Sequence, residues 1–364
     1  MGGSGAWPVA GVDYPRDSVE FAAWFPDDRA CADYLAWLRW GDMEFVCHLC
    51  GSIACGWPRR DGLAYDCGAC KSKTSVTAGT LFSKTRTPLT VWFRAAWDLT
   101  TRPNGQPARN LQRNLGLGSY QTAWTMLHRY RRAMVAPDRA RLSGVVELDE
   151  TVVGGKNKTG KRGRSKDANR HIVIVACENP GRSFVGGTGT KLGRARGIVI
   201  PDYTTPSTLA AIVEMVEPGS HLITDYASNI SSAAKKSGFV HTPINMSKMA
   251  GKPHLYLPAV SRAQAQLKRW LAGTIQGAAA SFHLQEYVWE FEFRFNRRSA
   301  KAPGLLFYRL LELSVQTGPI TYDDIAVGGS RERDIAPKPP GTGGRSPRSL
   351  AQPDAGRPWR DVVR

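Results

Sequence analysis

Apolar and polar residues follow one another along the chain with a period that changes from stretch to stretch. In residues 18 to 40 the apolar positions recur at helical spacing with a break near Pro26, which predicts two short amphipathic helices. Helical spacing returns in residues 71 to 136. From residue 327 onward Pro, Gly, Ser and Arg predominate, and such a composition buries too little apolar surface to fold. We therefore expect a disordered basic tail there.

The stretch from residue 71 to 136 predicts three helices. Pro88 opens the first, the second covers residues 106 to 115, and the third covers residues 119 to 134 after a turn that contains two glycines. The third helix carries the basic residues Arg129, Arg131 and Arg132. This layout is typical of a helix-turn-helix, whose second helix enters the major groove of DNA. Three-helix bundles that bind nothing share the pattern, so the alternative stays open.

Residues 145 to 244 alternate apolar runs typical of strands with helical segments. The expected order is βββαβαβ, with strands at 145–155, 171–177, 197–200, 221–225 and around Val240, and helices at 207–216 and up to Lys236. This order predicts an α/β fold of the ribonuclease-H-like kind, a mixed sheet flanked by helices. In that arrangement the first and fourth strands lie side by side.

Two acids occupy these neighbouring strands. Asp149 interrupts a run that otherwise reads as a buried strand, and Asp225 ends the fourth strand. A buried carboxylate is costly unless an ion pair or a metal ion compensates it. Two carboxylates so placed hold a pair of Mg²⁺ ions about 3.5–4 Å apart in enzymes that cleave phosphodiesters. As an alternative, Asp225 caps the following helix. Glu147 and Glu150 are alternatives to Asp149 as the metal-binding acid of the first strand. Glu147 shares the face of Asp149, whereas strict alternation points Glu150 to the other face.

A second metal site is predicted upstream. The residues that define it are two Cys-x-x-Cys pairs separated by sixteen residues: Cys47, Cys50, Cys67 and Cys70. Each pair offers two thiolates to one tetrahedral Zn²⁺, and the intervening segment has the length of a β-hairpin. We interpret it as a structural zinc ribbon, and Cys31, Cys55 and Cys177 as buried apolar residues.

The charge balance indicates a polyanionic partner. Lys and Arg number 49 against 31 Asp and Glu, which gives a net charge of +18. Residues 155 to 170 form a basic loop, in which Lys156, Lys158, Lys161 and Arg162 are candidates for contacts with DNA phosphates. Its Gly-x-x-x-x-Gly-Lys run lacks the Ser or Thr of a nucleotide-binding P-loop. The chain has no apolar run near the roughly 20 residues of a membrane span, so we expect no membrane partner and a cytoplasmic location.

Together these motifs resemble bacterial insertion-sequence transposases of the DDE superfamily that carry an N-terminal zinc ribbon and a helix-turn-helix. Four stretches between residues 18 and 298 carry the resemblance: residues 47–70; Thr-Ala-Gly-Thr-Leu-Phe-Ser-Lys-Thr-Arg at 77–86 with Trp92; Val-Glu-Leu-Asp-Glu-Thr-Val-Val-Gly-Gly-Lys at 146–156; and Leu-Lys-Arg-Trp-Leu-Ala-Gly-Thr at 267–274 with Glu-Phe-Glu-Phe-Arg-Phe-Asn-Arg-Arg at 290–298. The resemblance implies the segments 18–75 (helices and zinc ribbon), 76–137 (helix-turn-helix), 143–312 (catalytic domain) and 327–364 (tail).

The resemblance also implies site residues. Asp149 and Asp225 would be the first two catalytic acids and bind Mg²⁺ or Mn²⁺. Gln266 stands where the family has an Asn or Glu, and Ser261 where a His is expected. An amide oxygen still coordinates Mg²⁺, although one extra methylene shifts it by about 1 Å. Lys268 and Arg269 are candidates for contacting the phosphate near the cut. Glu286, Glu290 and Glu292 are interpreted as packing residues that form surface ion pairs. As an alternative, one of them replaces Gln266 as the third acid.

The implied function is metal-dependent strand cleavage and strand transfer at the inverted ends of an insertion sequence. The implied partners are double-stranded DNA, as element ends and as target, and further copies of the chain in a dimer or larger assembly near the nucleoid. Two alternatives remain at this point. One is a catalytically inactive, sequence-specific DNA-binding descendant, and the other is a structure-specific nuclease with the same fold.

Overall fold

The computed structural model describes residues 7–41, 45–53, 56–58, 62–136, 139–154, 170–182, 191–245, 248, 255–275 and 283–326. The chain forms two compact units. The helical unit combines the described residues up to 136 with 300–326, and the sheet unit comprises the described residues between 139 and 299. Among the described helices, none is both long and apolar enough to cross a bilayer.

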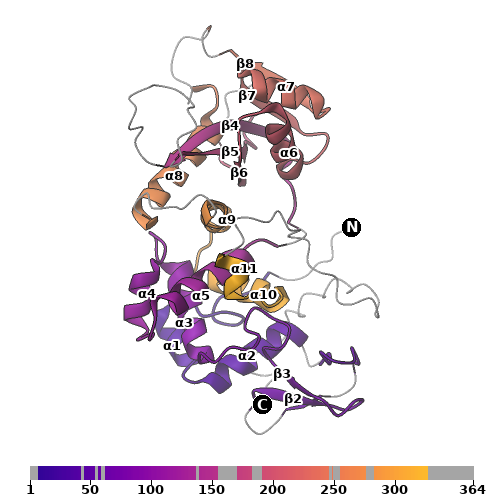
Figure 1. Ribbon diagram of the computed structural model, residues 1–364, viewed down its shortest axis with the longest axis vertical. Coiled ribbons are helices and arrows are strands. Elements are labelled where there is room, and N and C mark those ends of the chain that lie inside the picture. Colours follow the sequence, from indigo (N-terminus) through magenta and orange to yellow (C-terminus); the bar gives the residue numbers. More distant parts are fainter. Residues whose placement is uncertain are drawn as a thin grey trace. The chain divides into compact units, whose positions relative to one another are not determined.

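The helical unit contains a small antiparallel sheet and a group of helices (Figure 1). Its elements are α1 (Ser18–Trp24), α2 (Asp28–Trp40), β1 (Gly56–Pro58), β2 (Ala64–Cys67), β3 (Lys73–Ser75), α3 (Leu89–Thr101), α4 (Ala108–Asn114), α5 (Tyr120–Ala133), α10 (Gly304–Gln316) and α11 (Tyr322–Ala326). The two predicted N-terminal helices and the three predicted helices that follow the ribbon are all present.

An aromatic cluster forms the core of the helical unit. The ring of Phe307 lies 5.4–5.8 Å, between centroids, from the rings of Phe21, Phe25, Phe93 and Trp97. These rings come from α1, α3 and the residue after α1, so α10 belongs to this core although it is far away in sequence. The sequence motifs placed residues up to 312 in the catalytic domain, whereas the structure groups residues 300–326 with the helical unit.

The sheet unit is a five-stranded mixed sheet with helices on both faces (Figure 1). The strand order is β6-β5-β4-β7-β8, in which β4, β5 and β6 pair antiparallel and β4, β7 and β8 pair parallel. The elements are β4 (Val145–Gly154), β5 (Arg170–Glu178), β6 (Ala195–Ile200), α6 (Thr205–Met215), β7 (His221–Asp225), α7 (Ser228–Lys236), β8 (Val240–Ile244), α8 (Pro258–Ile275) and α9 (Leu284–Phe295). The predicted ribonuclease-H-like order and the adjacency of the first and fourth strands are confirmed.

Side chains of β4 alternate between the two faces of the sheet. Val146 and Leu148 pack in one core with residues of α6 and α7, and Val145 and Val153 pack in the other core with residues of α8 and α9. Because successive side chains of a strand point to opposite faces, Glu147 and Asp149 belong to the α8 face. The sequence of β4 thus directs two acids toward one helix.

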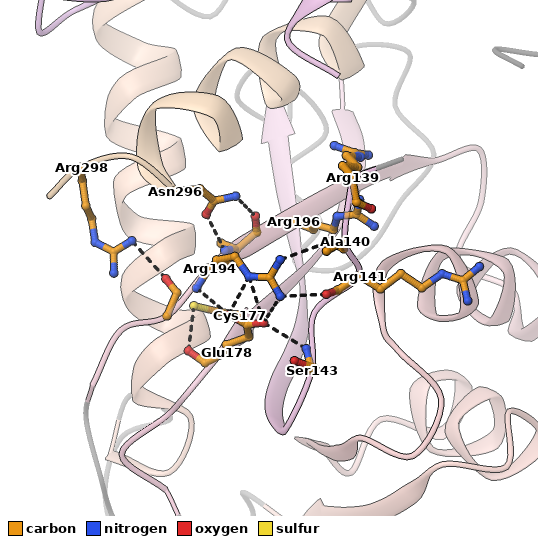
Figure 2. Close-up of polar contacts among 12 residues, drawn as sticks. Arg139, Ala140, Arg141, Ser143, Cys177, Glu178, Arg194, Arg196, Asn296 and Arg298 are labelled. Atoms are coloured by element: carbon orange, nitrogen blue, oxygen red, sulfur yellow. Dashed lines mark hydrogen bonds and ion pairs between the residues drawn. The ribbon is translucent and has the colours of Figure 1, made fainter. Parts of the chain in front are cut away.

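A partly exposed ion pair holds the residues before β4 against the end of β5 (Figure 2). The Arg194 guanidinium donates to the Glu178 carboxylate, with an N–O distance of 2.6 Å, and to the carbonyl of Arg141 at 2.8 Å. The Ser143 N–H also donates to Glu178, at 3.0 Å. These contacts stabilise the start of the sheet unit, at a place that is separate from α8.

Candidate active site

The middle of β4 and the end of β7 bring Asp149 and Asp225 together. The two strands are parallel, and their register pairs Leu148 with Thr224, so the two aspartates follow at the next position of each strand. β7 ends at Asp225, whereas β4 continues to Gly154. Beyond Asp149, the edge of β4 that faced β7 therefore has no strand partner among the described residues.

Glu150 joins the two aspartates. One carboxylate oxygen from each of Asp149, Glu150 and Asp225 lies within 4.8 Å of the others. Alternation along the strand predicted that the Glu150 side chain points to the opposite face of the sheet from Asp149. For the Glu150 carboxylate this prediction was wrong. The edge of β4 is open past the end of β7, so the longer Glu side chain reaches around it. The Tyr203 hydroxyl donates to Glu150 Oε2 at 2.8 Å.

Asp149 is strongly perturbed by this environment. Burial raises the pKa of Asp149 to about 7, the negative charges of Glu150 and Asp225 add to that shift, and hydrogen bonds from Gln264 and the Glu150 N–H oppose it. Three carboxylates that repel one another in a half-buried site gain stability from a divalent cation. Carboxylate oxygens are also the ligands that Mg²⁺ and Mn²⁺ prefer. The donor set therefore fits a divalent metal ion.

The amide that contacts the acids belongs to Gln264. Its Nε2 donates to Asp149 Oδ2 at 3.1 Å and to the Glu150 carbonyl at 3.2 Å. Gln266, which the family resemblance placed in the third position, follows two residues later on α8, about 200° further around the helix. The structure thus brings Gln264 to the acids in place of Gln266. The rotation of α8 about its own axis decides which of the two glutamines faces the acids.

The two basic residues predicted near the cut are both exposed on α8. Lys268 is four residues after Gln264 and so lies on the same side of the helix. Arg269 lies one position further around. Their role as phosphate contacts stays a prediction.

Asp225 does not cap the following helix. The N-cap of α7 is Ala227, without a side-chain capping bond, and the Ala227 N–H donates to Asp225 Oδ1 at 3.1 Å. This bond fixes the carboxylate beside the end of β7. The helix-cap alternative for Asp225 was therefore wrong, and its carboxylate faces Asp149 and Glu150.

The acids of α9 serve packing. Glu290 pairs with Arg294 at 3.1 Å, and Glu292 pairs with Arg139 at 2.7 Å and accepts the Gly197 N–H at 2.7 Å. The glutamates of these ion pairs are buried, although the sequence predicted ion pairs at the surface, because α9 packs against β6. Burial also raises the pKa of Glu292 to about 7, and the charge of Arg139 opposes this shift. Glu286, the third predicted substitute, is buried as well.

The four predicted zinc ligands form a separate cluster in the helical unit. The sulfur atoms of Cys47, Cys50, Cys67 and Cys70 all lie within 4.8 Å of one another. Two of their separations are 3.7 Å, between Cys47 and Cys70, and 3.8 Å, between Cys50 and Cys67. Sulfur ligands placed 2.3 Å from a tetrahedral zinc ion lie about 3.8 Å apart. The cluster therefore fits zinc, and these separations are too long for disulfides.

The two Cys-x-x-Cys knuckles have the same backbone pattern. The Gly51 N–H donates to the Cys47 carbonyl at 3.0 Å, and the Lys71 N–H donates to the Cys67 carbonyl at 3.0 Å. Gly51 has φ +68° and Lys71 has φ +57°. Each turn thus needs a left-handed residue after its second cysteine. Of the other cysteines, Cys31 and Cys177 are buried as predicted, and Cys55 lies outside the described residues.

The basic residues predicted to contact DNA differ in exposure. On α5, Arg129 and Arg132 are partly exposed, whereas Arg131 is only 3% exposed. The interpretation of Arg131 as a DNA contact is therefore wrong for this conformation, because its turn of α5 packs inward. Lys156, Lys158, Lys161 and Arg162 lie outside the described residues.

One family model matches part of the chain, and two solved structures are similar at low identity. Residues 141–296, which include all elements from β4 to α9, match the model of the ISXO2-like transposase domain. The catalytic core domain of BIV integrase is similar at 18% identity over 51% of this chain and 95% of that chain, with a TM-score of 0.23. A simian T-cell lymphotropic virus intasome in complex with PP2A regulatory subunit B56 gamma is similar at 16% identity over 52% of this chain and 61% of that chain, with a TM-score of 0.26. No curated protein matches the chain.

The matched segment and the acid cluster coincide. β4 and β7, which carry Asp149, Glu150 and Asp225, and α8, which carries Gln264, all lie within residues 141–296. The sequence motifs that indicated a DDE transposase are thus supported by an independent family match. Residues 141–296 are an ISXO2-like transposase domain, and the family predicted from the sequence is confirmed.

Proposed function

We propose that this protein is a transposase that uses divalent metal ions to cleave DNA strands at the inverted ends of an insertion sequence and to transfer them to a target. The observation that carries the proposal is the convergence of Asp149 and Glu150 of β4 with Asp225 at the end of the neighbouring strand β7. The transposase domain match supports the same chemistry.

Asp149, Asp225 and Glu150 would hold the Mg²⁺ or Mn²⁺ ions. Ions bound by such carboxylates activate the attacking oxygen and stabilise the leaving oxygen of a phosphodiester. The residues around the acids keep them in place. The Gln264 amide and the Glu150 N–H donate to the two Asp149 oxygens, the Ala227 N–H holds Asp225, and the Tyr203 hydroxyl holds Glu150.

DNA recognition is assigned to the helical unit and to the basic residues near the acids. The zinc ribbon and the helix-turn-helix of α4 and α5 would select the inverted ends, with Arg129 and Arg132 as candidate contacts. Lys268, on the same side of α8 as Gln264, would contact the phosphate backbone close to the reacting bond. Two ends held at once require at least a dimer of the chain on DNA.

One observation favours a second candidate, a catalytically inactive transposase descendant that binds DNA. Helix α8 contains no Asp or Glu, so the side chain it offers the site is the neutral Gln264. In the proposed enzyme Glu150 of β4 supplies the third carboxylate that α8 lacks. In the inactive descendant Glu150 does not take over the role of that missing carboxylate.

Cleavage of a duplex that carries the inverted repeats flanking the coding region tests the proposal. With Mg²⁺ or Mn²⁺ the wild-type protein should nick the repeat ends, and Asp149→Asn or Asp225→Asn should abolish nicking without loss of DNA binding. Glu178→Gln, which changes a buried acid of the same sheet away from the cluster, is the matched control. DNA binding by the wild type without cleavage under any divalent ion would favour the inactive descendant.

A further inference from the structure

Glu147 is the most deeply enclosed acid of β4, and the metal chemistry proposed above gives it no role. Its side chain is 0% exposed. Oε2 accepts the Ala259 N–H at 2.7 Å and the Val260 N–H at 3.1 Å. Oε1 accepts the Asn179 amide at 2.8 Å. The carboxylate therefore links β4 to the first turn of α8.

The first turn of α8 depends on this distant acceptor. Leu257 precedes the helix, and its carbonyl accepts the Ser261 N–H at 3.1 Å, but its apolar side chain has no oxygen to accept the free N–H groups of the first turn. Glu147 satisfies two of these N–H groups from across the interface, and its negative charge is favourable at a helix N-terminus. Helix α8 thus begins where Glu147 holds it.

Arg182 strengthens the same link. Its Nη1 donates to Glu147 Oε1 at 3.3 Å and to the Tyr256 carbonyl at 2.7 Å. Tyr256 lies two residues before α8, so the guanidinium joins the acid of β4 to the backbone that leads into the helix. The carboxylate charge of Glu147 is therefore both paired and fully hydrogen-bonded.

A second link joins the same two elements further along. The Gln264 amide donates to Asp149 Oδ2 and to the Glu150 carbonyl. From Ala259 to Gln264 the helix advances about 7.5 Å, and from Glu147 to Asp149 the strand advances about 6.6 Å. The two links are thus matched in spacing, and together they fix both the height and the rotation of α8 against β4.

We infer that Glu147 is a positioning residue of the transposase site, which sets the place of Gln264 and Lys268 by holding the N-terminus of α8 beside the metal-binding acids. This inference rests on the proposed function for its catalytic meaning. The mechanical part, that Glu147 fixes α8, rests only on the contacts of Glu147. Glu147→Gln would replace one carboxylate oxygen by an NH₂ group, which cannot accept the N–H donors that contact that oxygen. The contacts of that oxygen would be lost.

The first measurement is hydrogen exchange of the full-length protein without metal. In Glu147→Gln the amides of Ala259 and Val260 lose their charged acceptor, and we expect them to exchange about tenfold faster or more, while those of β5 change little. Glu178→Gln is the matched control, because Glu178 is also a buried acid that accepts two backbone N–H groups and pairs with an arginine (Figure 2). Equal exchange at the start of α8 in both variants would overturn the inference.

The second measurement is the apparent dissociation constant of Mn²⁺, obtained from the rise of the melting temperature with Mn²⁺ concentration and called the Mn²⁺ midpoint below. Partners that orient a metal ligand typically alter metal affinity 10–100-fold when they are mutated. We expect the midpoint to rise about tenfold in Glu147→Gln and to stay within about twofold in Glu178→Gln. If Glu147→Gln only lost general stability, its melting temperature would fall, as in Glu178→Gln, but its Mn²⁺ midpoint would not change. That result would refute positioning.

If Glu147→Gln does not fold, Arg182→Ala provides the same test. It removes the contact with the Tyr256 carbonyl but leaves the bonds of Glu147 to α8, so we expect a smaller shift of the same sign in both measurements. No shift in either would also overturn the inference. A wild-type protein with no Mn²⁺ response would refute the proposed function, whereas the exchange at the start of α8 would still decide whether Glu147 holds the helix.

Discussion

Replacing Gln264 with glutamate tests which residue of α8 faces the acids. The Gln264 Nε2 lies 3.1 Å from Asp149 Oδ2, and a carboxylate oxygen in its place would lose a hydrogen bond and add a like charge. Two like charges about 4 Å apart repel by about 4 kcal/mol at an effective dielectric constant of 20. Because Gln264 is only partly buried, solvent and side-chain rotation reduce this, and we expect a loss of about 1–2 kcal/mol without metal.

The same substitution should tighten metal binding. Such a loss lowers the melting temperature of the metal-free protein by about 2–8 °C. When a divalent ion is present the fourth carboxylate becomes a ligand, so we expect the Mn²⁺ midpoint of thermal stabilisation to fall about tenfold, which corresponds to about 1.4 kcal/mol. Thermal unfolding over a series of Mn²⁺ concentrations measures both effects in one experiment.

Gln266→Glu is the matched control, with the same change of charge on the same helix. Gln266 lies about 200° around α8 from Gln264, so this variant should change neither the metal-free stability nor the Mn²⁺ midpoint appreciably. If Gln266→Glu lowered the midpoint while Gln264→Glu did not, the placement of α8 against β4 would be wrong, and the third position would belong to Gln266.

Three further predictions concern the helical unit. Removal of zinc by a chelator, or Cys67→Ser, should unfold the ribbon, seen as loss of amide protection in β2 and β3, and a ribbon that stays protected without metal would contradict a structural zinc site. Lys71→Gly should raise the free energy of unfolding by about 1 kcal/mol in urea titrations, because Lys71 holds φ +57° at a position that favours glycine; no gain would contradict that geometry. Phe307→Ala should lower stability by about 3–5 kcal/mol and expose the aromatic core, and a loss below 1 kcal/mol would argue against α10 as part of this unit.

The sequence alone was sufficient for the elements and for most residues of the two candidate metal sites. The spacing of the four cysteines fixed which thiolates could share a zinc ion, because a tetrahedral site needs two closely spaced pairs. The alternation in β4 and the βββαβαβ order placed Asp149 and Asp225 on neighbouring strands, because strand pairing follows from topology. These features depend on local periodicity and on connection rules, which a sequence carries directly.

Only the tertiary structure decided which side chains complete the site. The rotation of α8 selects Gln264 over Gln266, and it depends on the distant contacts of Glu147. The early end of β7 opens the edge of β4, so that Glu150 joins the acids against the alternation rule. Likewise α10 joined the helical unit through the packing of Phe307. Such outcomes depend on contacts between residues far apart in the chain, and no local pattern of apolar and polar positions specifies them.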